Sequence, residues 1–258
     1  MTQELNPVTI PSEEKHLYKL PTSPFSQIPK KIHVIWVGDE NKRPDSWIQT
    51  WKDKHPEWEF RIWGNAELNG LSWKSKKQMD IFRSEGQWNG VADLMRYEIL
   101  YEHGGVYVDA DSVCVRTLDD WLLDTRLFAV WENEEYRPGL IACGFVGCIP
   151  KHPALRALVR AASRLNKPTY RRNWKTLHWK GFRPRFHYKG VKPWISVGPV
   201  FFTNVVMPFC PFDVTILPSV MFLPQHHFAK EERQSSLIYA KHIWGSTHEL
   251  YSEAAEAA

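Results

Sequence analysis

The sequence predicts an α/β fold in which helices cover a mostly parallel sheet, and three observations predict it. Runs rich in β-branched and aromatic residues alternate along the chain with runs of helical pattern. Residues 32–37 form a near-continuous apolar run, as in a strand that is buried on both faces. The pair Gly104 and Gly105 separates a helix-like run from a strand-like run, since glycine both ends helices and turns the chain.

The elements follow from these local patterns in chain order. Strands are expected at 32–37, 58–63, 106–110, 113–115, 127–131, 140–149, 214–217 and 220–223, the last two as edge strands. Helices are expected at 44–54, 74–84, 91–102, 118–123 and 153–165, and another follows Gly198-Pro199. Asp45 or Ser46 is expected near the cap of the first helix.

Length and composition predict one folded domain with short extensions. The chain has 258 residues, of which 43% are apolar and 14% aromatic. Residues 1–27 are polar and Pro-rich, so we expect them to form an N-terminal arm. We expect the folded domain to comprise residues 28–250 and a C-terminal tail to comprise residues 251–258.

The sequence also predicts a cytoplasmic protein. It has no apolar run long enough to cross a bilayer, and its N-terminus does not resemble a signal peptide. The four cysteines lack CxxC spacing and a disulfide framework, so we expect reduced thiols.

Charge is distributed unevenly, which predicts an anionic partner for the second half of the chain. Residues 136–212 contain fourteen Lys and Arg but no Asp or Glu. Within them, residues 166–194 hold nine of these bases and three Trp. Interleaved basic and aromatic residues suit a phosphorylated glycan, an anionic membrane surface, a protein or single-stranded nucleic acid. We favour an acceptor molecule or peripheral contact with a membrane over nucleic acid.

The stretch GVADLMRYEILYEHGGVYVDAD, residues 90–111, carries the clearest chemistry. Asp93 and Arg96 share one face of its helix, and Tyr107, Asp109 and Asp111 share one parity of the extended run that follows. Two carboxylates at i and i+2 repel each other, and a hard divalent cation would relieve that repulsion. A DxD pair alone is also common in surface turns, so the spacing by itself leaves both interpretations open.

The pattern ADLxRYxxLYxxGGxYxDxD in this stretch resembles the DXD-containing sugar-binding region of family 32 glycosyltransferases. That family includes the yeast initiating α-1,6-mannosyltransferase and bacterial enzymes of capsular polysaccharide biosynthesis. The resemblance implies a GT-A fold, a Rossmann-like mixed sheet flanked by helices in a single catalytic domain. It also implies a donor half at about 28–135 and an acceptor half at about 136–250.

The resemblance further implies a retaining, divalent-metal-dependent glycosyltransferase that moves a hexose from a nucleotide-sugar to a hydroxyl of a glycan, lipid or protein. A UDP-sugar is favoured on its frequency among relatives, and GDP-mannose is the alternative donor. The expected cofactor is Mn²⁺ or Mg²⁺, which stabilises a departing diphosphate. No carboxylate is identified as a nucleophile, so front-face attack is expected. The alternative function is a nucleotide-sugar or glycan-binding module with weak or no turnover.

The expected catalytic residues are Asp93, Arg96, Asp109 and Asp111. By resemblance, Asp111 and His242 bind the metal directly, and Asp109 reaches it through water or holds hydroxyl groups. Asp93 and Arg96 are expected to hold hydroxyls of the donor sugar.

Two further segments are expected to bind the nucleotide. Trp36 would stack on the base, while backbone groups near Val34 would read its edge. The family ends its catalytic domain with HxWxGSW, which His242 and Trp244 match here. Gly245 and His248 are expected near the phosphates, but His248 stands where the family has Trp, which puts that contact in doubt. His226 and His227 are the rival metal ligands.

Overall fold

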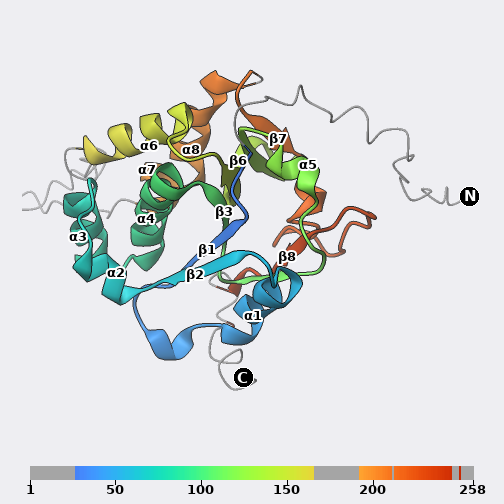
Figure 1. The fold of residues 1–258 in the computed structure, drawn as a ribbon, viewed down its shortest axis with the longest axis horizontal. Helices are drawn as coiled ribbons and strands as arrows, with labels where there is room; N and C mark the ends of the chain where they lie inside the picture. The colour runs from blue at the N-terminus through green and yellow to red at the C-terminus, as the bar shows by residue number, and fades with distance from the viewer. Residues whose placement is uncertain (1–26, 166–191, 211, 246–249, 251–258) are drawn as a thin grey trace, which may run out of the picture.

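A six-stranded mixed sheet forms the centre of the structure (Figure 1). The computed structural model describes residues 27–165, 192–210, 212–245 and 250. The strands of this sheet are β1 (Lys31–Ile35), β2 (Glu59–Trp63), β3 (Gly105–Val108), β5 (Leu127–Asn133), β6 (Arg137–Cys148) and β7 (Thr215–Leu217). They lie in the order β2-β1-β3-β6-β5-β7.

The sheet is more mixed than the alternation of elements predicted. β1 pairs in parallel with β2 and β3, and β7 pairs in parallel with β5. β6, however, runs antiparallel to both of its neighbours, β3 and β5. The α/β class is confirmed, and β7 is an edge strand as expected. The parallel pairing of β1 with β3 brings the carboxyl ends of both strands to one edge of the sheet.

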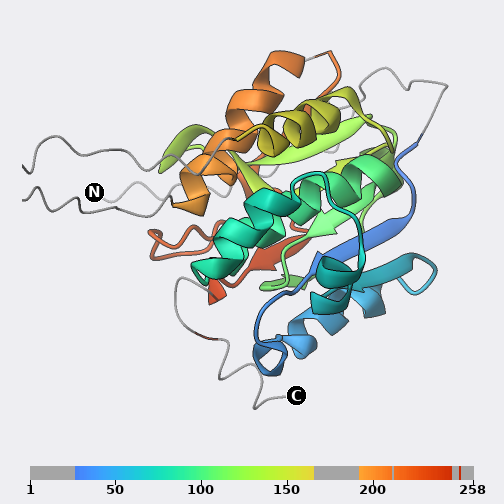
Figure 2. The same cartoon turned by 90° about the vertical axis from the view of Figure 1, so that its left-hand side faces the viewer.

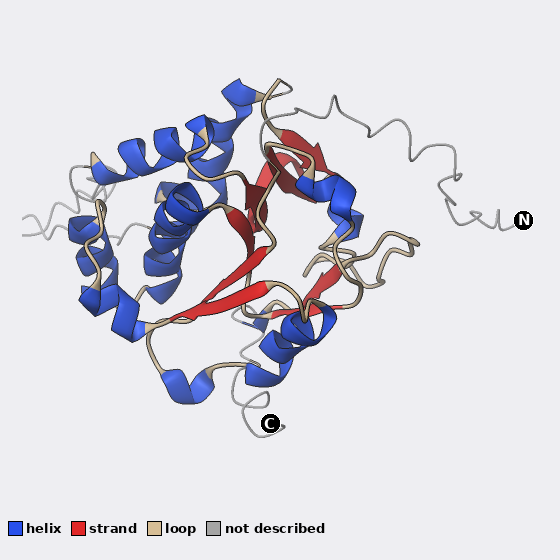
Figure 3. Ribbon diagram, viewed as in Figure 1, coloured by secondary structure: helices blue, strands red, loops and turns tan. Residues whose placement is uncertain are grey.

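Helices and a small second sheet cover the two faces of the central sheet (Figure 3). The helices are α1 (Asp45–Lys54), α2 (Asn65–Gly70), α3 (Lys76–Ser84), α4 (Trp88–His103), α5 (Asp120–Leu123), α6 (Pro153–Ser163), α7 (Pro193–Ser196) and α8 (Pro199–Val206). Short 3-10 turns lie at Glu40–Lys42, Met207–Phe209 and Ser219–Met221. The second sheet pairs β4 (Ser112–Cys114) with β8 (Ala240–His242).

Each face of the sheet has its own hydrophobic core. On one face, side chains of α3, α4, α6 and α8 pack together, and Figure 2 shows α4 beside α6 in front of the strands. On the other face, α1 and α5 pack with β4, β8 and the 3-10 turn at Ser219–Met221. The central strands are therefore buried on both sides, as the apolar run at 32–37 predicted.

One local prediction was wrong, because it depends on a contact with a distant part of the chain. Residues 220–223 are not a strand, because the chain turns after Pro218 and the Ser219 N–H donates to Glu134 Oε1 at 2.8 Å. Asp45 lies near the cap of α1 as expected, since it is the first helical residue and follows the N-cap Pro44. The Asp45 carboxylate pairs with Arg43 at 2.5 Å.

The junction between α4 and β3 has the conformation that its two glycines predicted. Gly104 has φ +62° and Gly105 has φ +90°, which are left-handed conformations that side chains disfavour. A Cβ at Gly104 would lie 2.6 Å from the Pro150 nitrogen, and one at Gly105 would lie 2.8 Å from the Lys31 carbonyl oxygen. The tight turn therefore lets β3 enter the sheet directly beside β1.

A buried histidine joins β1 to its surroundings. Trp63 Nε1 donates to His33 Nδ1 at 3.2 Å, so the proton of the neutral ring lies on Nε2, which is 2.9 Å from the Gly104 carbonyl oxygen. Burial lowers the pKa of His33 from 6.5 to about 4, against the opposing effect of the Gly104 carbonyl. His33 is therefore neutral in the folded protein near neutral pH.

Other predictions concern the termini, the thiols and the basic segment. The four cysteines are free thiols, as expected. Within the described ranges, no helix has the length and apolar character that a membrane crossing requires. The N-terminal arm up to residue 26, the C-terminal tail and most of the basic segment at 166–194 lie outside the described residues.

Candidate active site

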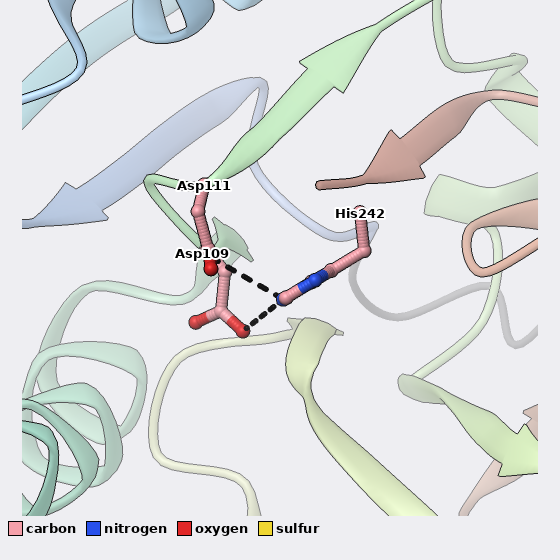
Figure 4. Close-up of side chains that lie close together, drawn as sticks. All are labelled: Asp109, Asp111 and His242. Atoms are coloured by element: carbon pink, nitrogen blue, oxygen red, sulfur yellow. Dashed lines mark ion pairs between the residues drawn. The ribbon is translucent and has the colours of Figure 1, made fainter. Parts of the chain in front are cut away.

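Three predicted metal ligands meet beyond the carboxyl end of β3 (Figure 4). Asp109 follows β3, Asp111 precedes β4, and His242 ends β8, which pairs with β4 through Ser112. His242 Nε2 lies 3.4 Å from Asp109 Oδ2 and 3.3 Å from Asp111 Oδ1. One ligand atom from each residue lies within 4.8 Å of the other two. We call these three residues the acidic cluster.

The donor atoms of the acidic cluster fit a divalent cation. Two carboxylates and one imidazole suit Mn²⁺ or Mg²⁺. Adjacent ligands of an octahedral ion, each about 2.1 Å from the metal, lie about 3 Å apart. The separations of 3.3 and 3.4 Å from His242 to the two carboxylates are close to that value. Small movements of these side chains would therefore suffice to bind an ion.

His242 presents a ring N–H to the two carboxylates. Burial would lower the pKa of His242, but Asp111 and Asp109 outweigh it and raise the pKa above the ordinary value. The Trp244 N–H donates to Nδ1 at 3.0 Å, so Nε2 carries a proton and points at Asp109 and Asp111. A cation bound through Nε2 must displace that proton.

Asp109 is held by two side chains behind it. Arg96 Nη2 donates to Asp109 Oδ1 at 3.1 Å, and the Tyr107 hydroxyl donates to the same oxygen at 2.8 Å. Burial alone would raise the pKa of Asp109, but Arg96, His242 and Tyr107 hold the pKa well below its ordinary value. Asp109 is therefore ionised and fixed, with Oδ2 directed toward His242.

Asp93 and Arg96 are paired on one helical face, as their spacing predicted. Arg96 Nη2 lies 3.3 Å from Asp93 Oδ1, and Arg96 Nη1 donates to the Cys143 carbonyl. Burial raises the pKa of Asp93 to about 6, although Arg96 opposes the shift. Both side chains are buried behind Asp109, which favours a role in positioning that carboxylate. Their direct contact with a donor sugar stays a prediction.

Asp109 also depends on a glycine in the neighbouring strand. The Asp109 N–H donates to the Gly144 carbonyl at 2.9 Å, which brings the two backbones together. A Cβ on Gly144 would lie 2.1 Å from Asp109 Oδ2 and 2.9 Å from Asp109 Cγ. Only glycine at this position leaves room for the carboxylate. No local pattern could predict this contact, because it joins residues that are far apart in the chain.

A cavity of about 300 Å³ opens beside the acidic cluster, and we call it the inner cavity. Its lining includes Asp109, His242, Glu132, Arg137, Trp194 and His227. Its volume lies at the lower end of the range for small-molecule sites, roughly 300–1,000 Å³. The inner cavity therefore gives a small ligand access to two members of the acidic cluster.

The expected nucleotide contacts lie partly at this edge of the sheet. Trp36 directly follows β1, and its Nε1 donates to the Asp39 carbonyl at 2.8 Å. Val34 is buried inside β1 opposite Ile62 of β2. The Gly245 N–H donates to Asp111 Oδ2 at 3.0 Å. His248 lies outside the described residues.

The rival histidines occupy a different position from His242. His226 Nε2 lies 3.6 Å from Glu132 Oε1, and His226 does not belong to the acidic cluster. His227 lines the inner cavity and packs against Trp244, with ring centroids 4.7 Å apart. Of these three histidines, the structure therefore brings only His242 into the group that could hold an ion.

Sequence reasoning missed several residues of the inner cavity. Glu132 is buried, and burial raises its pKa despite the nearby Arg137 guanidinium, whose Nε lies 3.8 Å away. A glutamate inside the apolar run of β5 was the available signal for Glu132. Arg137 and Trp194 had no such signal, because their cation–π contact joins β6 to α7 at 4.9 Å.

The fold is that of the GT-A glycosyltransferases. The structure is similar to the PaToxG glycosyltransferase, with a TM-score of 0.52 and 18% identity, over 72% of this chain and 70% of the other. The predicted fold class is therefore confirmed.

The sequence comparisons find similarity to a glycosyltransferase family. The family described as the glycosyltransferase sugar-binding region containing DXD motif matches residues 41–128, which include Asp109 and Asp111. The chain is thus related to the family 32 glycosyltransferases, as its signature predicted.

Fungal mannosyltransferases are among its curated relatives. Inositol phosphoceramide mannosyltransferase 3 of Schizosaccharomyces pombe is 26% identical over 75% of this chain and 49% of its own length. The initiation-specific alpha-1,6-mannosyltransferase of Candida albicans is 22% identical over 89% of this chain and 74% of its own length. The chain spans about half the length of the first of these relatives.

Proposed function

We propose that this protein is a retaining, metal-dependent glycosyltransferase that moves a hexose from a nucleotide-sugar to a hydroxyl acceptor. The observation that carries the proposal is the convergence of Asp109 and Asp111 with His242, from two distant segments of the chain, beside an open cavity. This cluster lies beyond the carboxyl end of β3, at the sheet edge where α/β folds bind their ligands.

Asp109, Asp111 and His242 would hold Mn²⁺ or Mg²⁺. When bound, the cation supplies Lewis-acid stabilisation for a diphosphate leaving group. The protein's own part is to keep the ligands in position. Arg96 and Tyr107 hold Asp109, while the Gly245 N–H holds Asp111. Loss of the His242 Nε2 proton couples metal binding to pH, so binding should weaken as pH falls.

Trp36 is proposed to stack on the base of the donor. It follows β1, whose carboxyl end lies at the same sheet edge as Asp109 because β1 and β3 are parallel. Stacking of a base on an aromatic ring is worth roughly 1–3 kcal/mol. A UDP-sugar remains our favoured donor, and the mannosyltransferase names of the relatives support GDP-mannose as the alternative.

We propose that the anomeric configuration of the sugar is retained because the acceptor hydroxyl attacks from the front face. A phosphate oxygen of the leaving group would take the proton of that hydroxyl. Asp109 is already engaged with Arg96 and Tyr107 and is not a free nucleophile. Glu132 also lines the inner cavity, and its Oε1 lies 3.8 Å from Arg137 Nε and 3.6 Å from His226 Nε2. We assign Glu132 to binding an acceptor hydroxyl, a role that needs no covalent intermediate.

The test is a comparison of donor hydrolysis and transfer between the natural protein and Asp111→Asn. UDP-glucose, UDP-galactose, UDP-N-acetylglucosamine and GDP-mannose would each be supplied with Mn²⁺ or with EDTA. We expect turnover of one donor, only with metal, and none with Asp111→Asn. Asp80→Asn is the matched control, since Asp80 is an exposed helical acid paired with Lys76 at 3.0 Å.

Two results would contradict the proposal. Full metal-dependent activity in Asp111→Asn would remove Asp111 from the site. Metal-dependent binding of a donor without any hydrolysis or transfer would instead indicate a nucleotide-sugar-binding module.

A further inference from the structure

A second cavity of about 470 Å³, which we call the outer cavity, lies next to the inner cavity. The two cavities share walls, because consecutive residues of the same segments face one or the other. Residues 132, 137, 223 and 227 line the inner cavity, and residues 133, 136, 224 and 226 line the outer cavity. The end of the β5–β6 hairpin and the loop at 223–233 therefore form a partition with a cavity on each side.

The outer cavity has an exposed aromatic face. Phe228 is 58% exposed and Tyr136 is 41% exposed, and their rings meet edge to face with centroids 6.3 Å apart. The buried His226 ring stacks on Tyr136 at 5.3 Å with an interplanar angle of 14°. Exposed aromatic rings that are held in place in this way are typical of binding sites.

Arg137 joins this aromatic face to the inner cavity. Its guanidinium carbon lies 5.6 Å from the centre of the Phe228 ring and 4.9 Å from that of the Trp194 ring. Trp194 lines the inner cavity, whereas Phe228 lines the outer cavity. A ligand that extends from the acidic cluster past Arg137 would therefore reach Phe228 and Tyr136.

The loop that carries Phe228 is held in shape by its own contacts. The Arg233 N–H donates to the Pro224 carbonyl at 3.0 Å and closes the loop. The Arg233 guanidinium lies 3.2 Å from Glu134 Oε2, which ties the loop to the β5–β6 hairpin. The Phe228 N–H donates to His226 Nδ1 at 3.3 Å. A preorganised wall of this kind loses little entropy when a ligand binds.

The polar groups around the outer cavity are of both signs. Its lining includes Glu135, Lys230, Glu231 and Arg233. In the described part of the chain, Glu135, Lys230 and Glu231 form no ion pair with another residue, and all three are exposed. Carboxylates accept from hydroxyl groups and an ammonium donates to them, so this set suits a polyhydroxylated ligand. A strongly anionic ligand would meet repulsion from Glu135 and Glu231.

Aromatic faces, mixed charges and a neighbouring reaction site together match one class of ligand. We propose that the outer cavity binds a pyranose of an oligosaccharide acceptor, one unit removed from the sugar whose hydroxyl enters the inner cavity. The apolar face of the pyranose would lie on Phe228 and Tyr136, with its hydroxyls toward Glu135, Lys230 and Glu231. This inference rests on the proposed glycosyltransferase function and gives that function a carbohydrate acceptor of at least two units.

The test compares acceptors of different length. Methyl glycosides of mannose, glucose, galactose and N-acetylglucosamine would be assayed beside disaccharides of the same sugars, and kcat/KM for the acceptor would be measured. We expect the natural protein to prefer a disaccharide over its monosaccharide. Phe228→Ala and Tyr136→Ala should each reduce that preference roughly three- to tenfold, since they remove the stacking surface. Phe212→Ala is the matched control, because Phe212 is 94% exposed and lines neither cavity.

Three results would overturn the inference. One is equal use of mono- and disaccharides by the natural protein. Another is an unchanged preference in both aromatic variants. The third is transfer only to inositol phospholipids, offered in mixed micelles, with none to sugars. Donor hydrolysis without acceptor, measured in the natural protein, separates these results from failure of the proposed function, which would abolish hydrolysis as well.

Discussion

Gly144→Ala should disable the acidic cluster by adding a single methyl group. The new Cβ would lie 2.1 Å from Asp109 Oδ2, whereas ordinary contact begins near 3.4 Å. The carboxylate would have to retreat by about 1.3 Å, if the strand itself stays in place. Gly144 does not have a left-handed conformation, so alanine suits its backbone and the fold should persist.

Asp109 cannot retreat by that distance and keep its present contacts. Arg96 holds it at 3.1 Å, the Tyr107 hydroxyl at 2.8 Å, and His242 lies 3.4 Å away. Metal–ligand distances tolerate changes of only about 0.2 Å. A misplacement of about 1 Å at a reacting group can cost roughly 100-fold in rate. We therefore expect Gly144→Ala to lower donor turnover at saturating Mn²⁺ about 100-fold.

The assay is metal-dependent hydrolysis of the donor, together with thermal unfolding without ligands to check the fold. Gly70→Ala is the control, because a Cβ at Gly70 would meet nothing within 4 Å. Hydrolysis by Gly144→Ala at the natural rate, with the same demand for Mn²⁺, would refute the reasoning. It would mean either that Asp109 does not act in the site or that β6 shifts to accommodate the methyl group without loss of stability.

Three further predictions address the acceptor side, the pH dependence and the core. If Glu132 only binds an acceptor hydroxyl, Glu132→Gln should retain measurable transfer with a raised KM for the acceptor. Loss of all turnover would instead indicate that Glu132 is a nucleophile. Because the pKa of His33 is about 4 when folded and 6.5 when unfolded, the free energy of unfolding should fall as pH drops from about 6.5 to about 4. In urea titrations across that range, the free energy of unfolding of His33→Gln should fall by about 3 kcal/mol less than that of the natural protein. Parallel curves of unfolding free energy against pH for the two proteins would contradict this. Gly147→Ala should destabilise the fold by about 1–3 kcal/mol, because its Cβ would lie 2.1 Å from the buried Phe128 ring, and an unchanged melting temperature would contradict it.

The parts of the fold that the sequence predicted are those set by local pattern. The helix at 91–102, the glycine pair after it and the strand that follows were all read from neighbouring residues, and each is present. The antiparallel course of β6 could not be read this way, because strand direction is decided by pairing with β3 and β5. The wrong strand at 220–223 has the same cause, since Glu134 holds Ser219 from 85 positions away.

In the candidate site too, the residues of local motifs were predicted, and the residues whose roles depend on distant contacts were not. Asp109 and Asp111 lie within one motif, and the family pattern supplied His242, which lies more than 130 positions further along the chain. The structure brings the three together through the pairing of β4 with β8. Glu132, Gly144 and the walls of the two cavities could not be predicted, because their roles arise only from contacts between segments.

The most direct test of the acidic cluster is a thermal-shift measurement with each nucleotide-sugar, with Mn²⁺ and with EDTA, on the natural protein and Asp111→Asn. A ligand at 100 times its Kd adds about 2.7 kcal/mol of stability, which raises the melting temperature measurably. We predict that one donor raises the melting temperature of the natural protein only with Mn²⁺ and leaves Asp111→Asn unchanged. An equal rise in EDTA, or an equal rise in Asp111→Asn, would show that Asp109, Asp111 and His242 do not hold the donor through a metal ion.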